Sequence, residues 1–539
     1  MLKKEFKGYN KNKLGKDLLA GVTVAAVALP IALAFAVASG ASAAAGLITA
    51  VIAGLIAGSL SGGSFQISGP AGTMTAILLP LMMKYQIQGV FIACFLSGII
   101  LLICGLLRLG NLVSYLPLSV FTGFTSGIAI IIALGQINNL TGLTSEGTST
   151  VSKITSYFRL EQNFNITAFI IGVSVIVFMI AYPKRLNKYF PSSLLAIIIA
   201  TILNITFKFN VTGVGAIPKT IMLPERLSLS SLNLSDIKPL IIPSISIAAL
   251  VMIESLLCGA SAGRMKKEKL NNNQELIAQG FSNMVIPFFG GVPATAALAR
   301  TSVGIKSGGK TRLTSIFHAL FLLVSMLLLG PFIMHIPLSA LAGVLMVAAW
   351  RMNEWTVIHN IFDKKIKVSI FQFLLTMIST VIFDLTFAIL IGIIFSIIMF
   401  IVKVSDMQVN VSEVCPDKID GEIDNEDFLE RHGKISVAYI TGPLYFGTAN
   451  LLSDKLSDIT ESNILILSMR GVPFSDVSGV QALQELVSNL SHNNTTVYFA
   501  CVQPPVMEMF ERYGFANKMG DNSFFWSTDK VLSYLSKIN

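Results

Sequence analysis

Two charged residues, Arg300 and Glu254, stand inside long apolar stretches of this sequence. Arg300 comes after the Gly-Gly-Val-Pro segment 290–293 and a run of small residues. Glu254 has apolar neighbours for more than a helical turn on both sides. A charge in such a stretch is costly unless it faces water, an ion or an opposite charge. We therefore predict that Arg300 binds an anion and that Glu254 carries a proton. The alternatives are that Arg300 clamps helix ends, and that Glu254 pairs permanently with Arg300 or bonds to unwound backbone.

Two segments rich in glycine and proline are candidates for the backbone of this site. In 62–73 a Gly-Pro pair interrupts the apolar stretch before a helix that is expected to start near Ala71, and in 290–302 a second helix is expected to start at 299–301. A helix that begins inside a membrane directs free N–H groups, and roughly half a unit of positive charge, at the space before it. Two ordinary packing segments are the alternative. The residues predicted to bind an anion are Ser68, Gly69, Pro70, Ala71, Gly72, Thr73, Ala299, Arg300 and Thr301.

Membrane-spanning helices must position these residues. The 539 residues are 53% hydrophobic and 13% charged, with a mean hydropathy of +0.71, which is the composition of a membrane protein. Apolar stretches long enough to cross a bilayer follow one another closely, and we predict about fourteen spans. They are 18–39, 43–60, 65–83, 88–107, 119–138, 166–182, 193–207, 243–261, 273–289, 293–306, 313–330, 333–350, 367–384 and 386–403.

The predicted spans divide into two sets of seven around the polar loop 218–239. Two sets with an odd number of spans enter the membrane from opposite sides, which indicates an inverted repeat. The two interrupted segments are the third span of each set. A lysine-rich head precedes the first span, and basic residues cluster at span ends on the same predicted side. We therefore expect a multi-pass protein of the cell membrane with both termini in the cytoplasm.

A small α/β domain is predicted at the C-terminal end, where strand-like and helix-like segments alternate. The predicted organisation is an N-terminal cytoplasmic segment (1–16), a transmembrane domain (17–404), a linker (405–432) and the α/β domain (433–539). Asp476 and Ser478 stand where a strand passes into a helix, as a helix cap does. The sequence contains no pattern of a catalytic triad or a phosphate-binding loop, so an enzyme is not expected. The net charge of +9 is spread over span ends, and nucleic acid is therefore not a predicted partner.

Four stretches of the membrane region carry a recognisable pattern: 17–30, 66–70, 254–257 with 273–280, and 289–295 with 299–301 and 307–311. In these stretches the membrane region resembles the sulfate permease family, also called SulP or solute carrier family 26. The resemblance implies a fold like that of uracil permeases, with core and gate domains and an anion site between the third and tenth spans. It implies transport of sulfate, bicarbonate, dicarboxylates or halides, with the lipid bilayer and a second copy in a homodimer as partners.

The C-terminal domain resembles a STAS domain. In the anti-sigma factor antagonists that share this fold, the serine of the motif at 476–479 is phosphorylated, which implies a regulatory phosphorylation site at Ser478. The resemblance also implies that the domain binds a cytoplasmic protein or docks two protomers. A helix cap formed by Asp476 and Ser478 is the structural alternative for the same residues.

Four positions differ from the pattern of the family. Ala71 stands where many members carry Thr, which leaves backbone N–H groups and Thr73 to hold the anion. Ile31 stands where many members carry Gln or Glu, which leaves Glu254 as the candidate for coupling. Cys258 and Leu298 stand where sodium-coupled relatives supply oxygen ligands, and a hard cation needs oxygen. We therefore expect no metal or cofactor, and coupling to protons rather than sodium. The expected function is secondary active transport of a small anion by alternating access. The alternatives are a nucleobase permease of the same fold, a membrane-tethered STAS sensor or scaffold, and a passive anion channel.

Overall fold

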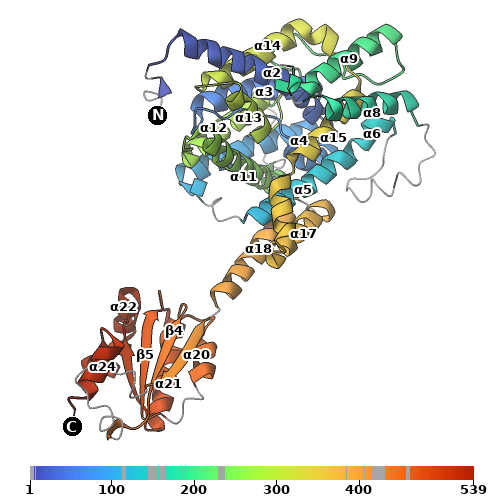
Figure 1. Cartoon of the computed structure of the whole chain (residues 1–539). Helices are drawn as coiled ribbons and strands as arrows, with labels where there is room; N and C mark the ends of the chain where they lie inside the picture. The colour runs from blue at the N-terminus through green and yellow to red at the C-terminus, as the bar shows by residue number, and fades with distance from the viewer. Residues whose placement is uncertain are drawn as a thin grey trace. The chain divides into compact units, whose positions relative to one another are not determined.

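The chain forms two compact units, Met1–Ile393 and Ile394–Asn539, the first made of helices and the second built around a β-sheet (Figure 1). The computed structural model describes residues 5–6, 8–111, 117–143, 156, 164–183, 185–188, 190–228, 237–383, 385–405, 407–414, 431–456 and 462–538.

Helices of the first unit are long and apolar. Six helices in the described part of the chain have the length and composition to cross a membrane, and several shorter apolar helices accompany them. Their bounds are α2 (Lys11–Ala38), α3 (Ala43–Leu60), α4 (Gly72–Leu106), α5 (Leu118–Gly135), α6 (Ile137–Thr141), α8 (Ile166–Ala181), α9 (Ser192–Phe207), α11 (Ile241–Lys266), α12 (Asn272–Val285), α13 (Leu298–Lys306), α14 (Leu313–Ile333), α15 (Leu338–Met352), α16 (Trp355–Asp363) and α17 (Lys367–Ile382). The last apolar helix, α18 (Leu385–Val404), begins in the first unit and ends in the second.

Each predicted span falls on one of these helices. The third and fourth spans share the label α4, but they are two helices that meet at Gln86, where φ is 57° and ψ is −170°, outside the helical region. Gln86 lies in the polar gap between the two predicted spans. The short helices α6 and α16 were not predicted, because neither is long enough to give a span signal.

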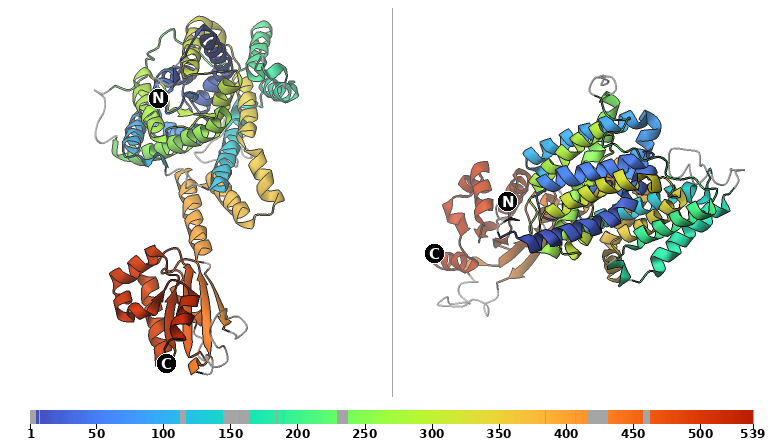
Figure 2. Two further views of the ribbon diagram at one scale, coloured as in Figure 1. Left: turned by 60° about the vertical axis from the view of Figure 1, so that its left-hand side comes forward. Right: turned by 90° about the horizontal axis from the view of Figure 1, so that it is seen from above.

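Two groups of helices pack mainly within themselves. One group contains α2, α3, α4, α11, α12, α13 and α14, and the other contains α5, α6, α8, α9, α15 and α17. In the first group α14 lies along α2 and α3 (Figure 2). The contact between α2 and α3 is very close, since a Cβ atom on Gly46 would lie 2.2 Å from the carbonyl oxygen of Ala32. These groups correspond to the core and gate division that the sequence resemblance implies.

Large apolar side chains point outward from the helical unit. They are exposed on α8, α9, α14 and α17, and they include Ile170, Val177, Ile202, Leu328, Phe332, Phe371 and Ile378. Exposing a continuous apolar surface of this kind to water is unfavourable, whereas lipid tails solvate it. The outer surface of the unit is therefore a lipid-facing surface.

The second unit contains a five-stranded sheet in the order β3-β4-β5-β6-β7. The strand β3 (Gln408–Glu413) is antiparallel to β4 (Ile435–Thr441), while β5 (Ile464–Gly471), β6 (Thr496–Ala500) and β7 (Phe524–Phe525) continue in parallel. Because β3 lies inside the predicted linker 405–432, the sheet begins earlier than the predicted boundary at 433. The helices of this unit are α20 (Ala449–Leu456), α21 (Val477–His492), α22 (Pro504–Tyr513), α23 (Phe515–Met519) and α24 (Thr528–Leu535).

Both faces of this sheet are covered. Leu465, Leu467 and Phe499 belong to the larger apolar cluster, together with side chains of α20, α21 and α22. Ile464 and Ile466 point to the other face, where they pack with side chains of α24. Strands buried on both faces have continuous apolar runs, which explains the unbroken Ile-Leu-Ile-Leu run of β5.

Candidate functional site

The two interrupted segments meet in the first unit. The strand β1 (Ser68–Gly69) pairs antiparallel with β2 (Thr295–Ala296), and Gly69 lies opposite Thr295. Each strand is followed within a few residues by a helix, α4 after β1 and α13 after β2. The helix α13 begins at Leu298, slightly before the predicted 299–301. The third and tenth predicted spans are therefore half-helices whose N-terminal ends are joined by a short β-ribbon.

The first turns of both half-helices are not capped by a side chain. Ala71 is the N-cap residue of α4 and Ala297 is that of α13, and a methyl group accepts no hydrogen bond. Four other helices of the unit have a side-chain cap, provided by Asn10, Ser42, Asn165 and Asn271. Further helices without such a cap, among them α5, α9, α11 and α15, do not begin at the β1–β2 ribbon. Since uncapped N–H groups need another acceptor, these two helix ends are suited to binding an anion.

Arg300 connects α13 to the other half-helix. Its side chain is only 2% exposed, and Nη1 donates a hydrogen bond to the carbonyl oxygen of Pro70 at 2.9 Å. A Cβ atom on residue 69 would lie 2.9 Å from Nη1, so a larger residue there would push the guanidinium group aside. Nε and Nη2 of Arg300 are buried and have no hydrogen-bond partner in the protein. The guanidinium group thus clamps the first segment with one nitrogen and keeps two donors available, so both predicted roles are compatible with the geometry.

Glu254 lies at the first turn of α4. Its Oε2 accepts a hydrogen bond from the hydroxyl of Thr73 at 2.6 Å, and its charge interacts electrostatically with Arg300. Among the ion pairs within 4.0 Å that involve described residues, none joins Glu254 to Arg300. The direct ion pair that the sequence left open is therefore not formed. The structure instead brings Glu254, Thr73 and Arg300 to the ends of the two half-helices.

The remaining predicted residues have different positions. Ser68 and Thr301 are buried and bonded to neighbouring helices or strands, since Gln279 donates to the Ser68 hydroxyl at 2.7 Å and the N–H of Ile67 donates to the Thr301 hydroxyl at 3.2 Å. The hydroxyl oxygens of Ser68 and Thr301 therefore help to hold the two interrupted segments in place. Ala71, Gly72 and Thr73 are buried at the start of α4, whereas Ala299 is exposed at the start of α13.

Two amide side chains of α12 that we did not predict hold the ribbon in place. Asn283 accepts a hydrogen bond from the N–H of Ala294 at 2.8 Å and donates to the Ala294 carbonyl oxygen at 2.9 Å. Gln279 donates to Ser68 and also to Glu275, at 2.8 Å. Side chains four residues apart share one face of a helix. That spacing of Gln279 and Asn283 was the sequence signal available for finding them.

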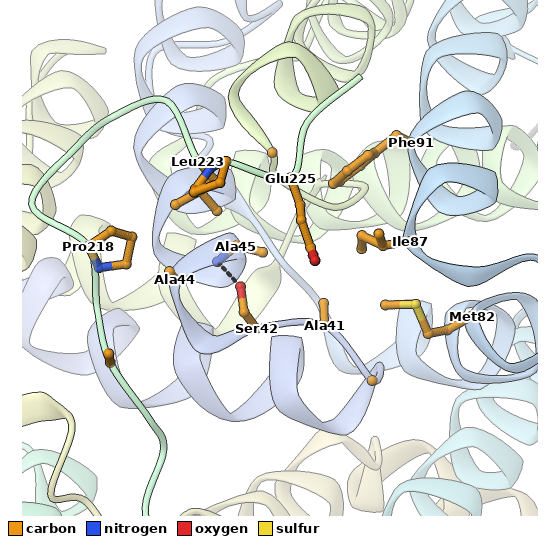
Figure 3. Close-up of a pocket in the computed structure, with 14 residues that line it drawn as sticks. Ala41, Ser42, Ala44, Ala45, Met82, Ile87, Phe91, Pro218, Leu223 and Glu225 are labelled. Atoms are coloured by element: carbon orange, nitrogen blue, oxygen red, sulfur yellow. Dashed lines mark hydrogen bonds between the residues drawn. The ribbon is translucent and has the colours of Figure 1, made fainter. Parts of the chain in front are cut away.

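A pocket of about 300 Å³ lies elsewhere in the unit, where α2 ends and α3 begins (Figure 3). Ser42 caps α3 there by accepting a hydrogen bond from the N–H of Ala45 at 3.2 Å. Met82, Phe91 and Leu223 supply apolar walls, and Glu225 contributes its carboxyl group. None of the residues predicted to bind an anion lines this pocket, so it is separate from the site at the half-helices.

Comparison with known proteins decides the family. The model of the sulfate permease family matches residues 14–379, which is more than half of the chain. The chain belongs to the sulfate permease family. The model of the STAS domain matches residues 429–530. The chain is therefore a multi-pass anion transporter of the SulP family with a C-terminal STAS domain, and not an enzyme.

Relatives within the sulfate permease family match nearly the whole chain. The putative sulfate transporter YvdB of Bacillus subtilis is 33% identical over 541 residues, which cover 98% of each chain. The bicarbonate transporter BicA of Synechocystis is 29% identical over 496 residues, covering 89% of this chain and 87% of BicA.

Solved structures of other transporters confirm the predicted fold. The murine anion transporter Slc26a9 in its inward-facing state has a TM-score of 0.83 at 19% identity, and the match covers 98% of this chain and 92% of that one. The transmembrane domain of a cyanobacterial BicA has a TM-score of 0.64 at 29% identity, over 72% of this chain and 98% of that domain. In the described part of the SulP chain, no group of three or more His, Cys, Asp or Glu residues could hold a metal ion.

Proposed function

We propose that this protein is a secondary active transporter of a small oxyanion, driven by protons and operating by alternating access. The substrate class is sulfate, bicarbonate or a dicarboxylate, which the uncapped ends of α4 and α13 and the free donors of Arg300 would bind together. The names of YvdB and BicA, a putative sulfate transporter and a bicarbonate transporter, support this class. The observation that carries proton coupling is the hydrogen bond between Thr73 and Glu254.

The Thr73–Glu254 hydrogen bond suggests how a proton and an anion are coupled. A carboxylate at the first turn of a helix is itself an anion bound to the helix end. In this position, ionised Glu254 competes with the substrate for Thr73 and for the positive potential of Arg300. Protonation removes the competing charge, so the substrate and a proton enter together. Cys258 and Leu298 offer no side-chain oxygen in this region, which supports protons over sodium.

Uptake into proteoliposomes tests the proposed function. Labelled sulfate, bicarbonate and fumarate are supplied with and without an inward proton gradient, and saturable flux of at least one anion that the gradient accelerates is expected. A thermal-shift screen with the same anions and with uracil separates the alternatives: stabilisation by uracil alone would indicate a nucleobase permease. Lack of both flux and stabilisation would support a sensor or scaffold, and fast, non-saturating flux would support a channel.

Replacing Glu254 by Gln is expected to remove about one proton from the transport cycle. Glutamine keeps the hydrogen bond to Thr73 but cannot ionise, so substrate no longer competes with a charge. At equilibrium, with the membrane potential clamped at zero, a gradient of one pH unit should accumulate about tenfold less anion than in the unmodified protein. Glu225→Gln, an exposed glutamate away from the half-helices, is the matched control. An unchanged accumulation ratio in Glu254→Gln would remove this residue from the coupling mechanism.

We place the protein in the cell membrane with both termini in the cytoplasm. The lysines and arginines at the ends of α11, α13 and α16 support this orientation, because basic residues are retained on the cytoplasmic side. The proposed domains are a cytoplasmic segment (1–16), a transporter domain (17–404), and a C-terminal STAS domain (433–539) after a connecting segment (405–432) whose β3 joins the sheet.

We also propose that the STAS domain binds a second copy in a homodimer or a cytoplasmic partner. Phe446, Phe474 and Val477 are exposed beside one another at the start of α21, and the ring of Tyr445 contacts both phenylalanines. A cluster of exposed aromatic side chains is typical of a protein-binding surface. This surface borders the Asp476–Ser478 motif.

Ser478 is the proposed regulatory phosphorylation site on that surface. Its side chain is exposed, while Asp476 caps α21 by accepting a hydrogen bond from the N–H of Gly479 at 2.8 Å. Asp476 also accepts from the N–H of Phe446 at 3.2 Å. A negative charge on residue 478 would repel Asp476 and weaken its hold on Phe446.

Ser478→Glu is therefore expected to weaken self-association or partner binding by the STAS domain at least about fivefold, while Ser478→Ala leaves it unchanged. Analytical ultracentrifugation of the full-length protein in detergent measures self-association, and Ser536→Glu, near the C-terminal end, controls for added charge. Equal association of the two glutamate variants and the unmodified protein would argue against regulation at Ser478.

A further inference from the structure

His318 is a buried titratable residue that the proposed coupling mechanism does not use. It lies on α14 with 0% exposure, and neither Nδ1 nor Nε2 has a hydrogen-bond partner in the protein. Buried polar groups are nearly always hydrogen-bonded, because an unpaired one loses its interactions with water without replacement. An imidazole left in this state within a transporter domain requires a functional explanation.

Close packing surrounds His318, whose backbone lies against α2 and whose imidazole lies against α3. A Cβ atom on Gly21 of α2 would lie 3.0 Å from the backbone nitrogen of His318, and a Cβ atom on Gly54 of α3 would lie 3.5 Å from its Cδ2. Ser315, on the preceding turn of α14, donates a hydrogen bond to the carbonyl oxygen of Gly54 at 3.1 Å. The ring therefore has a fixed position and cannot turn outward to lipid or bulk water.

The helix α3 links His318 to the anion site. A Cβ atom on Gly69, beside the guanidinium of Arg300, would lie 3.4 Å from the Cα of Ala50. Ala50 and Gly54 are four residues apart, which places them on one face of α3, one turn from each other. Gly69, which lies beside Arg300, and His318 thus pack against successive turns of the same helix. The charge of Arg300 acts electrostatically on the imidazole.

Arg300 is the charged group that faces His318 most directly. The helices α3 and α14 contain no other charged or titratable side chain. Asp17 of α2 is bonded to Thr314 and to the segment before α14, and the lysines of α2 stand before Asp17. Lys306 of α13 is exposed, and Glu254 of α11 is bonded to Thr73. The balance of charge around the imidazole therefore depends on whether Arg300 is neutralised by a bound anion.

We propose that His318 is a second proton site of the transport cycle, linked to anion occupancy at Arg300. This proposal rests on the proposed function and extends it. With the site empty, the guanidinium repels a second positive charge on the imidazole. A bound anion offsets that repulsion, and the lone pair of one ring nitrogen then accepts a proton that enters from bulk solution through the anion site. By linkage, anion binding takes up this proton, and protonation of His318 tightens anion binding by the same factor.

Proton uptake on anion binding tests the linkage. The full-length protein in detergent, in weakly buffered solution with a pH indicator, is titrated with sulfate, chloride and fumarate at pH values from about 4.5 to 7.5, where a perturbed histidine is expected to titrate. His318→Gln and His318→Asn should each take up about one proton fewer per anion bound at the acidic end of this range. Glu254→Gln should keep the uptake that His318 contributes, and the double variant Glu254→Gln/His318→Gln should lose both contributions.

The control variant is His335→Gln, which removes an exposed histidine at the end of the same helix. A purely structural role of His318 would change anion affinity equally at all pH values and leave the number of protons per anion unchanged. That result, in either His318 variant, would overturn the inference while leaving the proposed transport intact. If the unmodified protein binds none of the three anions, the proposed function fails first, and the inference fails with it.

Discussion

Replacing Arg300 by Ala is expected to weaken anion binding at least roughly a hundredfold and to reduce transport to background, because a buried charge partner is removed from the site. The variant also leaves the carbonyl oxygen of Pro70 without its donor, at a cost in stability of about 1–3 kcal/mol. Isothermal titration with the anion that the thermal-shift screen identifies gives the affinity, and the unfolding midpoint in detergent shows whether the fold persists.

Two further variants separate the roles of Arg300. Arg300→Lys keeps the charge but loses the planar fork, so it should bind the anion more weakly than the unmodified protein and more strongly than Arg300→Ala. Lys306→Ala removes an exposed positive charge from the end of the same helix and should change binding little. If Arg300→Ala folds and binds the anion with unchanged affinity, Arg300 clamps helix ends and does nothing more.

Replacing Asp17 by Asn is expected to destabilise the transporter domain by about 3 kcal/mol, because hydrogen bonds to a buried charge are strong. Asp17 is 0% exposed. Its Oδ1 accepts hydrogen bonds from the N–H groups of Lys310 and Thr311, at 2.5 and 3.0 Å, and from the Thr314 hydroxyl at 3.0 Å. Its Oδ2 accepts from the hydroxyls of Thr311 and Tyr9, at 2.6 and 2.9 Å. An amide replaces one of these oxygens by a donor, so at least two donors lose their acceptor.

The destabilisation is measured as a lower unfolding midpoint in detergent. The segment that Asp17 holds connects α13 to α14, so we also expect slower transport, since Arg300 lies on α13. Asp363→Asn, an exposed aspartate at the end of α16, is the control and should leave the midpoint unchanged. A midpoint for Asp17→Asn equal to that of the control would show that these hydrogen bonds contribute little to stability.

The sequence predicted the principal features of the fold and the residues that meet at the site. Gly-Pro and glycine-rich breaks in the third span of each half are local signals, and the physical chemistry of a bilayer gives them one interpretation. The proximity of Glu254 and Arg300 also followed, since each is an isolated charge in an apolar stretch.

The partners of these side chains could not be predicted. Glu254 bonds to Thr73, while Thr301 and Ser68 help to hold the two interrupted segments in place. These contacts depend on how α11 and α12 are rotated relative to the β1–β2 ribbon. Helix rotation is set by packing over the whole unit, which a single sequence pattern does not define. The strand β3 was missed for a related reason: as an edge strand it is mostly exposed, and alternation of buried and exposed residues is weak at an edge.

The pairing of β1 with β2 has a consequence for the direction of transport. Because the ribbon and the amides of Asn283 and Gln279 hold the two half-helices together, the groups that contact the anion are expected to keep one arrangement while the surrounding helices move. An anion would then meet the same ligands from either side of the membrane, with equal intrinsic affinity. Under the proposed proton coupling, net accumulation would come from the proton difference across the membrane, and reversing that difference would reverse the direction of net transport.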